Sequence, residues 1–208
     1  MDLKARWENF WKGVSPKEAI QSTWTDLYEH YTASDRAYHT LDHIAQCLDQ
    51  LDQARYLARS PHLIEVALWY HDVVYDSHAK DNEEQSADFA LQHLRELRSG
   101  ETYRNRVAEL IMATKHVDTF SESQSDERLI VDIDLTGLGV PWEAYKIYSD
   151  AIRFEYQWVP IPEYKKGRVA VLCAFLDRPH IYNHRHFRGM YEVRARENLA
   201  REIAELSS

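Results

Sequence analysis

Apolar residues recur every three or four positions along most of this chain, and no other feature of the sequence constrains its fold as strongly. A helix with 3.6 residues per turn gathers such positions on one face. The stretch 44–54 is typical, with apolar side chains at Ile44, Cys47, Leu48 and Leu51. Alternating strand-like patterns are hard to find, and only six glycines and six prolines interrupt 208 residues. The sequence therefore predicts an all-α protein whose amphipathic helices share a core.

Two segments carry the signature of a helix start. Glu18 follows Ser15 by three residues, and Glu84 follows Asp81 by three residues. A capping side chain with an acidic residue at this distance predicts a capping box. The segment 129–138 contains β-branched residues that would also suit a strand, but no partner strand is evident, so we expect a helix there.

Composition and charge exclude several classes of protein. The chain has 44% hydrophobic and 28% charged residues, as a globular domain does, and no stretch reaches the roughly 18 apolar residues of a membrane span. A formal net charge of -9 argues against a nucleic-acid polymer as partner. The charged amino terminus is unlike a signal peptide, and Cys47 and Cys173 suit buried thiols rather than a disulfide. We therefore expect a cytoplasmic protein with no membrane partner.

The doublet His71-Asp72 is the most informative chemical feature. It directly follows the apolar run 66–70 and precedes Val73, so both polar side chains are expected to be buried. Burying ionisable groups is costly unless they are paired or bind a metal. Adjacent helical residues point about 100° apart, so an ion held by both needs further ligands from other helices.

Three other stretches offer such ligands. His39 and His43 stand four residues apart, which on a helix places both on one face, where they can address one cavity. Asp132 and Asp134 follow an apolar segment, and His116 follows a predicted helix. Taken singly, His116 and each of these aspartates are better explained as hydrogen-bonded structural residues.

In their order along the chain, these segments resemble the HD superfamily of metal-dependent phosphohydrolases, above all its small bacterial members. The segments that carry the resemblance are residues 36–44 (RAYHTLDHI), 69–76 (WYHDVVYD), 81–87 (DNEEQSA) and 132–139 (DIDLTGLG), with a tail between 167 and 199. A His-Asp pair alone is a weak signal, but the similarity runs in order over about residues 24–205. It implies an HD-domain helical bundle that forms one domain over residues 1–208.

The resemblance also implies a set of metal ligands. His43 matches the family's first metal-binding histidine, and His71 and Asp72 match its doublet. The segment that begins at Asp134 is similar to the Asp-Leu-Ser segment that supplies the final ligand in cyclic nucleotide phosphodiesterases of the same superfamily. This similarity favours Asp134 over Asp132 as the last ligand.

Two further histidines take roles from the same resemblance. His39 is similar to the first histidine of a Tyr-His-Asn segment, which acts as general acid, although Thr40 stands here in place of the asparagine. His116 resembles the extra histidine that some members use for a second ion. Asp72 is expected either to bridge to that ion or to accept the proton of the attacking water.

The chemistry of these residues agrees with that assignment. Imidazole and carboxylate ligands together suit a divalent ion, here Mn, Mg, Fe, Ni or Zn, with one or two ions per chain. Such an ion generates a hydroxide nucleophile near neutral pH, and His39 would protonate the leaving oxygen.

Four residues are candidates for substrate contacts. Asn82 and Glu83 begin the helix after the doublet, where they would either order water and touch substrate or simply cap the helix. Basic residues concentrate in the last third of the chain, and most are expected to pair with acidic neighbours. Arg168 and Arg178 stand next to apolar segments and are the better candidates for binding phosphate.

The resulting hypothesis is a phosphohydrolase that cleaves a small phosphate mono- or diester, with nucleotides among the candidate substrates, by a metal-bound hydroxide. A non-catalytic sensor that binds a metal and a phosphorylated ligand is the first alternative. A di-iron HD-type oxygenase is the second, and it ranks last because only His116 is a clear spare ligand. Neither the substrate nor the oligomeric state can be read from the sequence.

Overall fold

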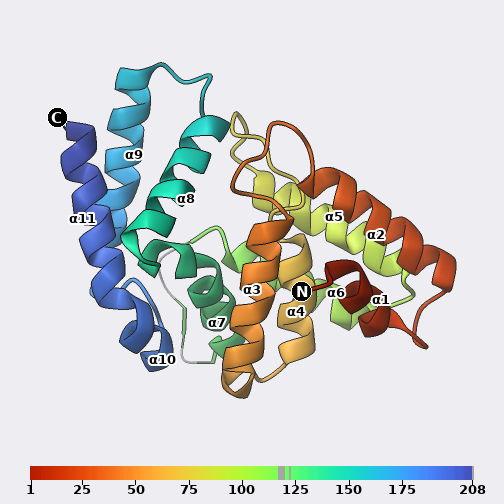
Figure 1. The fold of residues 1–208 in the computed structure, drawn as a ribbon. Coiled ribbons are helices and arrows are strands. Elements are labelled where there is room, and N and C mark those ends of the chain that lie inside the picture. The colour runs from red at the N-terminus through yellow and green to blue at the C-terminus, as the bar shows by residue number, and fades with distance from the viewer. Residues whose placement is uncertain (117–119, 122, 208) are drawn as a thin grey trace. The chain divides into compact units, whose positions relative to one another are not determined.

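The computed structural model describes residues 1–116, 120–121 and 123–207, and within those ranges the regular secondary structure is helical, without a strand (Figure 1). The prediction of an all-α protein is therefore confirmed, and the segment 129–138 is helical rather than a strand, with an α-helix up to Asp134 and a 3-10 helix after it. The chain divides into two compact units, Met1–Ile130 and Val131–Ser208. The expectation of one domain over the whole chain stays a prediction.

The described residues of the first unit form six α-helices and the beginning of a seventh, which continues into the second unit. They are α1 (Leu3–Trp11), α2 (Lys17–Tyr31), α3 (Leu41–Ala54) with the short 3-10 helix η1 (Arg55–Leu57), α4 (Pro61–Tyr70), α5 (Asn82–Glu96), α6 (Glu101–Ala113) and α7 (Ser125–Asp134).

Helix α4 lies at the centre of the first unit. It packs against α3, α5 and α6, and every side chain from Ile64 to Tyr70 is buried. Within this buried stretch all side chains are apolar except Glu65, whose carboxylate pairs with Arg6 and Arg55, which suits a helix inside the core. His71 and Asp72 directly follow the last residue of this central helix.

The amino-terminal helix closes this core with aromatic side chains. Trp7 is fully buried, its ring meets Trp69 edge to face, and its indole N–H donates to the carbonyl oxygen of Ile20 at 3.2 Å. Edge-to-face pairs of this kind are worth about 0.5–1.5 kcal/mol beyond the area they bury. Helix α1 is thus part of the packed body of this unit.

Neither predicted capping box forms. Helix α2 begins at Lys17, and the hydroxyl of Ser15 donates instead to the carbonyl oxygen of Leu97 at 2.7 Å. Asp81 precedes α5 without a side-chain cap and accepts a hydrogen bond from the Gln85 side chain. Contacts within the folded unit therefore replace the local capping bonds that the spacing suggested.

The second unit is made of the end of α7 and the helices that follow it. These are η2 (Leu135–Gly139), α8 (Trp142–Glu155), α9 (Ile161–Leu176), α10 (Arg185–Phe187), the π-helical turn η3 (Arg188–Glu192) and α11 (Val193–Ser207). Helices α9 and α11 lie side by side (Figure 1). A Cβ atom at Gly139 would lie only 2.6 Å from Cβ of Tyr191, so the approach of η2 to η3 requires glycine at this position.

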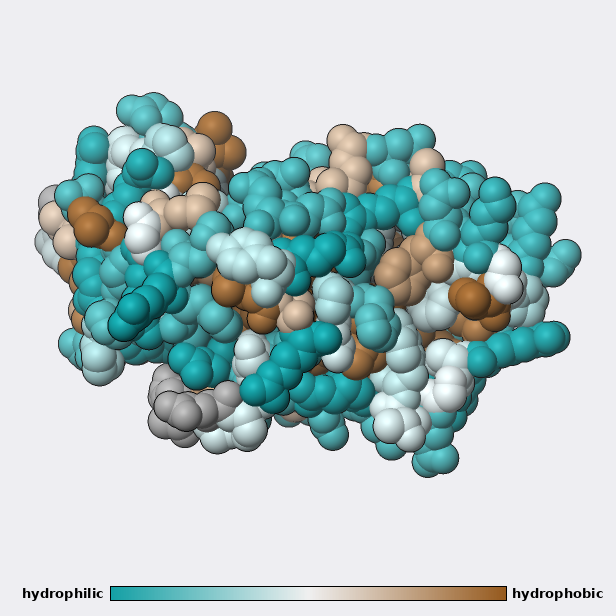
Figure 2. Space-filling model, turned by 90° about the horizontal axis from the view of Figure 1, so that it is seen from below, coloured by the Kyte–Doolittle hydropathy of each residue, from teal (hydrophilic) through white to brown (hydrophobic). Residues whose placement is uncertain are grey.

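The surface is mainly hydrophilic where Figure 2 shows it, and hydrophobic side chains form small separate patches on that side. In the described part of the chain, no helix is both long and apolar enough to span a membrane.

Candidate metal centre

Three of the predicted ligands come from two helix ends of the first unit. His43 lies in the first turn of α3, which begins at Leu41 after an extended Thr40. His71 caps the carboxyl end of α4, and Asp72 follows it. Both histidines are buried, with exposed fractions of 3% and 1%, and Asp72 is half-buried. The ring nitrogens are therefore shielded while the carboxylate keeps contact with solvent.

The polar atoms of these three side chains converge on one point. Nε2 of His43 lies 3.1 Å from Nε2 of His71 and 3.4 Å from Oδ2 of Asp72, and Nε2 of His71 lies 3.0 Å from the same Oδ2. Two ligand atoms that each lie about 2.1 Å from one ion, with a ligand–metal–ligand angle of 90°, are about 3 Å apart. The three separations thus fit adjacent positions around a single cation.

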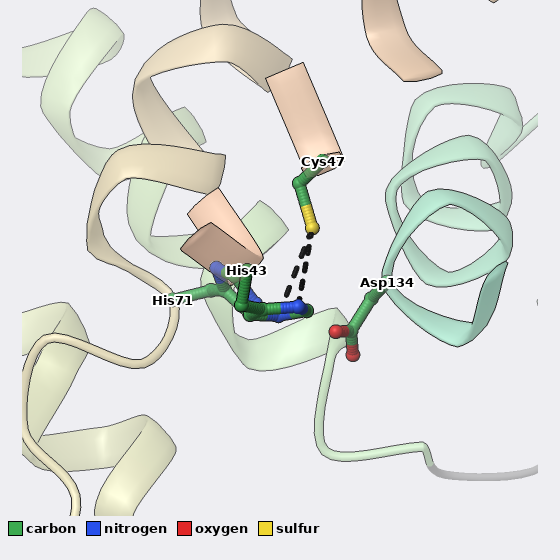
Figure 3. A group of neighbouring side chains, drawn as sticks. All are labelled: His43, Cys47, His71 and Asp134. Atoms are coloured by element: carbon green, nitrogen blue, oxygen red, sulfur yellow. Dashed lines mark hydrogen bonds between the residues drawn. The ribbon is translucent and has the colours of Figure 1, made fainter. Parts of the chain in front are cut away.

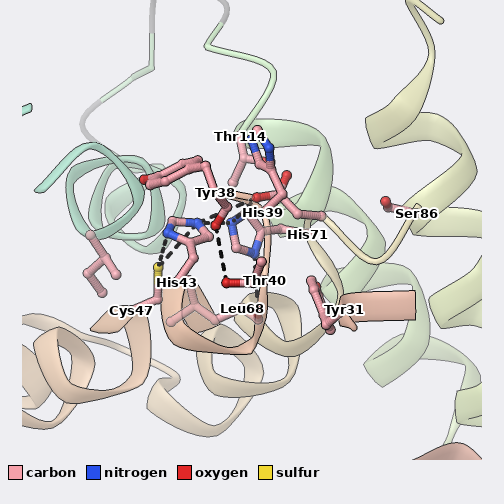
Figure 4. Close-up of polar contacts among 12 residues, drawn as sticks. Tyr31, Tyr38, His39, Thr40, His43, Cys47, Leu68, His71, Ser86 and Thr114 are labelled. Carbon is pink, nitrogen blue, oxygen red and sulfur yellow. Dashed lines mark hydrogen bonds and ion pairs between the residues drawn. The ribbon is translucent and has the colours of Figure 1, made fainter. Parts of the chain in front are cut away.

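The orientation of His71 is fixed by a bond on the far side of its ring. Nδ1 lies 3.0 Å from the carbonyl oxygen of Leu68, which can only accept, so Nδ1 carries the proton (Figure 4). In the neutral ring, Nε2 then presents a lone pair towards the Asp72 carboxylate. Two acceptors facing each other at 3.0 Å require a positive charge between them, either a proton or a metal ion.

The Asp72 carboxyl is held in its charged form. Burial by itself raises its pKa, but the charges of His71 and His39 and the hydrogen bonds from His43 and His71 outweigh this effect. The net result is a pKa well below the usual 3.8. A carboxylate ligand is therefore available throughout the neutral range.

The thiol of Cys47 lies beside this group, and sequence reasoning missed it. Its sulfur is 3.7 Å from Nε2 and 3.8 Å from Nδ1 of His43, one helical turn away (Figure 3). A sulfur equidistant from both nitrogens in the ring plane would clash with the carbon between them, so it lies over the ring face. With His43 and His71, Cys47 belongs to a group that could hold a metal, in which its sulfur would be the ligand atom. The four-residue spacing from His43 was the available signal.

The position of His39 relative to α3 differs from the prediction. It precedes α3 and is not helical, so the idea that His39 and His43 share a helix face is wrong. The backbone N–H of Thr40 bonds the carbonyl oxygen of Tyr38 at 2.8 Å, so the turn encloses His39, and the ring centres of His39 and His43 lie 6.3 Å apart. The His39 ring stacks on Tyr75 with centres 3.7 Å apart and planes within 24°, a contact that no local pattern suggested.

The two aspartates at the end of α7 differ in their surroundings. Asp132 is fully buried, and its carboxylate accepts four hydrogen bonds in the second unit, from the backbone and side chains of Asn183 and His184 at 2.6–3.0 Å. These bonds give Asp132 a structural role and agree with the choice of Asp134 as the ligand. Asp134, also drawn in Figure 3, is the last residue of α7. Its place in the metal site stays a prediction.

Other predicted residues have partners of their own. His116 follows α6 in a left-handed conformation with φ 57°, and its role with a second ion stays a prediction. Asn82 bonds both the backbone N–H and the carbonyl oxygen of Asp76 at 3.0 Å, so it shapes the loop before α5. Glu83 is half-buried in the first turn of α5, and its proposed contact with substrate stays a prediction.

The two arginines proposed for phosphate binding lie in the second unit. Arg168 forms a two-pronged ion pair with Glu202, with N···O distances of 2.8 and 3.1 Å, so the structural alternative is favoured for it. The Arg178 guanidinium stacks on Phe175, 4.6 Å from the ring centre. A role in phosphate binding stays a prediction for Arg178.

Comparisons of the chain with family models, curated proteins and solved structures found no match. The fold and the site together define an all-α protein with a candidate metal centre of histidine and aspartate side chains beside a cysteine. This description is compatible with an HD-type domain.

Proposed function

We propose that this protein is a metal-dependent hydrolase of small phosphate esters, of the HD type. The observation that carries the proposal is the convergence of His43 Nε2, His71 Nε2 and Asp72 Oδ2 within 3.4 Å of one another at the end of a buried helix. Side chains that are costly to bury have been brought together with their lone pairs facing, which is the arrangement that a divalent cation stabilises.

A divalent cation held by these residues would acidify water and offset the negative charge of a phosphate ester. The chain itself supplies the remaining functions. His71 keeps its Nε2 lone pair directed at the site through its bond to Leu68. Asp72 stays ionised because histidines surround it, so its carboxylate is available to bind the cation or to bridge to a second one.

His39 is the proposed proton donor to the leaving oxygen. Its ring stacks on Tyr75, which fixes the plane in which its nitrogens lie. Its charge is one of the causes that lower the pKa of Asp72. A positioned acid of this kind typically contributes a factor of 10²–10⁴ in rate.

Asp134 is the proposed fourth ligand, on the strength of the sequence resemblance and of the structural bonds that occupy Asp132. We expect Asp134→Asn to weaken binding of Mn²⁺ at least tenfold, because a neutral amide is a poorer ligand than a carboxylate. Equilibrium dialysis with metal analysis measures this. Asp132→Asn serves as the comparison, and equal Mn²⁺ affinity in wild type and Asp134→Asn would remove Asp134 from the site.

The function itself is tested by metal content and turnover together. Protein purified without chelator should carry a divalent metal and hydrolyse at least one of a set of nitrophenyl mono- and diesters and nucleotides. EDTA should abolish hydrolysis, and adding back Mn²⁺, Mg²⁺, Fe²⁺, Ni²⁺ or Zn²⁺ singly should identify the ion that restores it. Tight metal binding without turnover of any ester would instead support the sensor, and absence of metal binding would end the proposal.

A further inference from the structure

Arg36 connects two segments of the candidate site through backbone carbonyls. It lies between α2 and α3, and its guanidinium donates to the carbonyl oxygens of Asp72 and Val73, each at 2.7 Å. The nitrogen that bonds Asp72, Nη1, also donates to the carbonyl oxygen of His39 at 3.2 Å. One guanidinium group therefore holds the backbone of the metal-ligand turn and the backbone of the proposed proton donor.

The position of the Arg36 guanidinium just beyond the end of α4 has a physical cause. Helix α4 ends at Tyr70, and the carbonyl oxygens at and just beyond a helix end lack partners within the helix. A cation at this end is also favoured by the helix dipole. The planar fork of an arginine can bond two carbonyl oxygens at once, which a lysine ammonium cannot do with the same geometry.

The guanidinium is itself held from another side. It lies over the ring of Tyr31, 5.2 Å from the ring centre, and the Tyr31 hydroxyl donates to the carbonyl oxygen of Trp69 at 3.0 Å. Tyr31 is almost fully buried in α2. Tyr31 and Arg36 thus hold the backbone on either side of His71, at Trp69 before it and at Asp72 and Val73 after it.

We infer that Arg36 is a positioning residue that sets the distance between the metal ligands of the His71-Asp72 turn and the proton donor His39. This inference rests on the proposed function. Arg36 touches neither the cation nor the substrate; it acts through the backbone of the residues that do. Groups that orient metal ligands in this way typically account for a factor of about 10–100 in metal affinity or activity.

The first test measures metal affinity alone. Arg36→Ala and Arg36→Lys are compared with wild type by competition for Mn²⁺ and Co²⁺ against a coloured chelator, and the absorption spectrum of bound Co²⁺ reports the ligand geometry. We expect Arg36→Ala to weaken binding about 10–100-fold and to change the Co²⁺ spectrum, with Arg36→Lys between it and wild type. Arg104→Ala is the matched control, because Arg104 also donates to a backbone carbonyl, that of Ser99, in the α5–α6 loop.

The second test separates positioning from general stability. At saturating metal, Arg36→Ala should keep a low kcat with a nearly unchanged KM, because the His39 segment is still not held in place. Millimolar guanidinium chloride should restore part of the metal affinity and of kcat in Arg36→Ala, and neither should change in Arg104→Ala. A purely structural role would give neither the spectral change nor the rescue.

Wild-type metal affinity and spectrum in both Arg36 variants would overturn the inference, and so would full recovery of kcat at saturating metal. If Arg36→Ala does not fold, Arg36→Lys decides by the same readouts. If wild type binds metal but hydrolyses no ester, the proposed function fails while the affinity comparison still tests Arg36. If wild type binds no metal, both fail.

Discussion

Glu202 in the second unit and Asp72 in the first are carboxylates whose negative charge is neutralised in different ways. In the second unit, Glu202 accepts two bonds from Arg168, one from Ser149 at 3.0 Å and one from Tyr145. In the first unit, Asp72 faces the ring nitrogens of His43 and His71 at 3.4 and 3.0 Å. Glu202 thus meets a permanent cation, whereas Asp72 meets groups whose charge depends on a proton.

The difference separates a structural ion pair from a site that can bind a ligand. The donors around Glu202 are chemically fixed, because arginine stays protonated in proteins. The imidazoles around Asp72 can exchange their proton for a metal ion, and they offer lone pairs once they have done so. The comparison predicts that removing Asp72 changes metal binding and that breaking the Arg168–Glu202 pair changes stability.

The largest expected effect is in the first unit. Asp72→Ala should abolish metal uptake and any hydrolysis, because the two imidazoles lose the charged partner that completes the group. The helical circular dichroism should stay largely intact, since Asp72 lies beyond α4 and is only half-buried. Elemental analysis beside circular dichroism measures both.

Asp76→Ala is the control for this variant. Asp76 is an exposed aspartate four residues further on, bonded to His78, and its removal should leave the metal content unchanged. Stoichiometric metal retained by Asp72→Ala would contradict the assignment of the site.

The next effect concerns stability in the second unit. Arg168→Ala should lower the free energy of unfolding by about 3–5 kcal/mol, because it leaves the buried Glu202 carboxylate without its cation. Urea unfolding measures this, while metal content should stay at the wild-type level.

Two further variants sharpen that result. Lys166→Ala removes an exposed charge from the same helix and should change the free energy of unfolding by no more than about 0.5 kcal/mol. Replacing Arg168 and Glu202 together by apolar residues should cost less than Arg168→Ala alone. A loss of metal in Arg168→Ala would break the division between the two carboxylates.

The smallest effect is a dependence of stability on pH. Burial raises the pKa of Glu202, but its bonds to Arg168 and the arginine's charge outweigh burial and hold the pKa below the usual 4.5. The stabilisation that this carboxylate provides is complete above pH 4.5 and is lost as pH falls towards the lower folded-state value.

Glu202→Gln lacks this titration, so its free energy of unfolding should fall less steeply than that of wild type below pH 4.5. Urea unfolding at neutral pH and at several acidic values checks the difference between the two slopes. Parallel curves would show that Glu202 carries no special ion pair.

The candidate site shows how far a single sequence leads. The apolar run before His71 predicted that the doublet would be buried, which is confirmed for His71, whereas Asp72 is half-buried. The sequence resemblance added His43, and the structure brings it to His71. The helical relation assumed for His39 was wrong, because spacing alone does not show where a helix begins.

Residues that act through the backbone were beyond the reach of sequence patterns. Arg36 bonds carbonyl oxygens 36 and 37 positions away, and every residue has a carbonyl, so no residue type marks the partner. The Ser15 hydroxyl likewise donates to the carbonyl oxygen of Leu97, 82 positions away, instead of capping α2. Such bonds depend on which helix ends come together.

The sequence by itself determined the helical class, the burial of α4 and the chemical types available at its end, because these follow from the local spacing of apolar and polar residues. Only the tertiary structure decided that Asp72 would face the imidazoles of His43 and His71, and that Glu202 would pair with Arg168. The reason is that a polar side chain takes its partner from whatever packing brings within about 3 Å, and packing is set by contacts between distant segments.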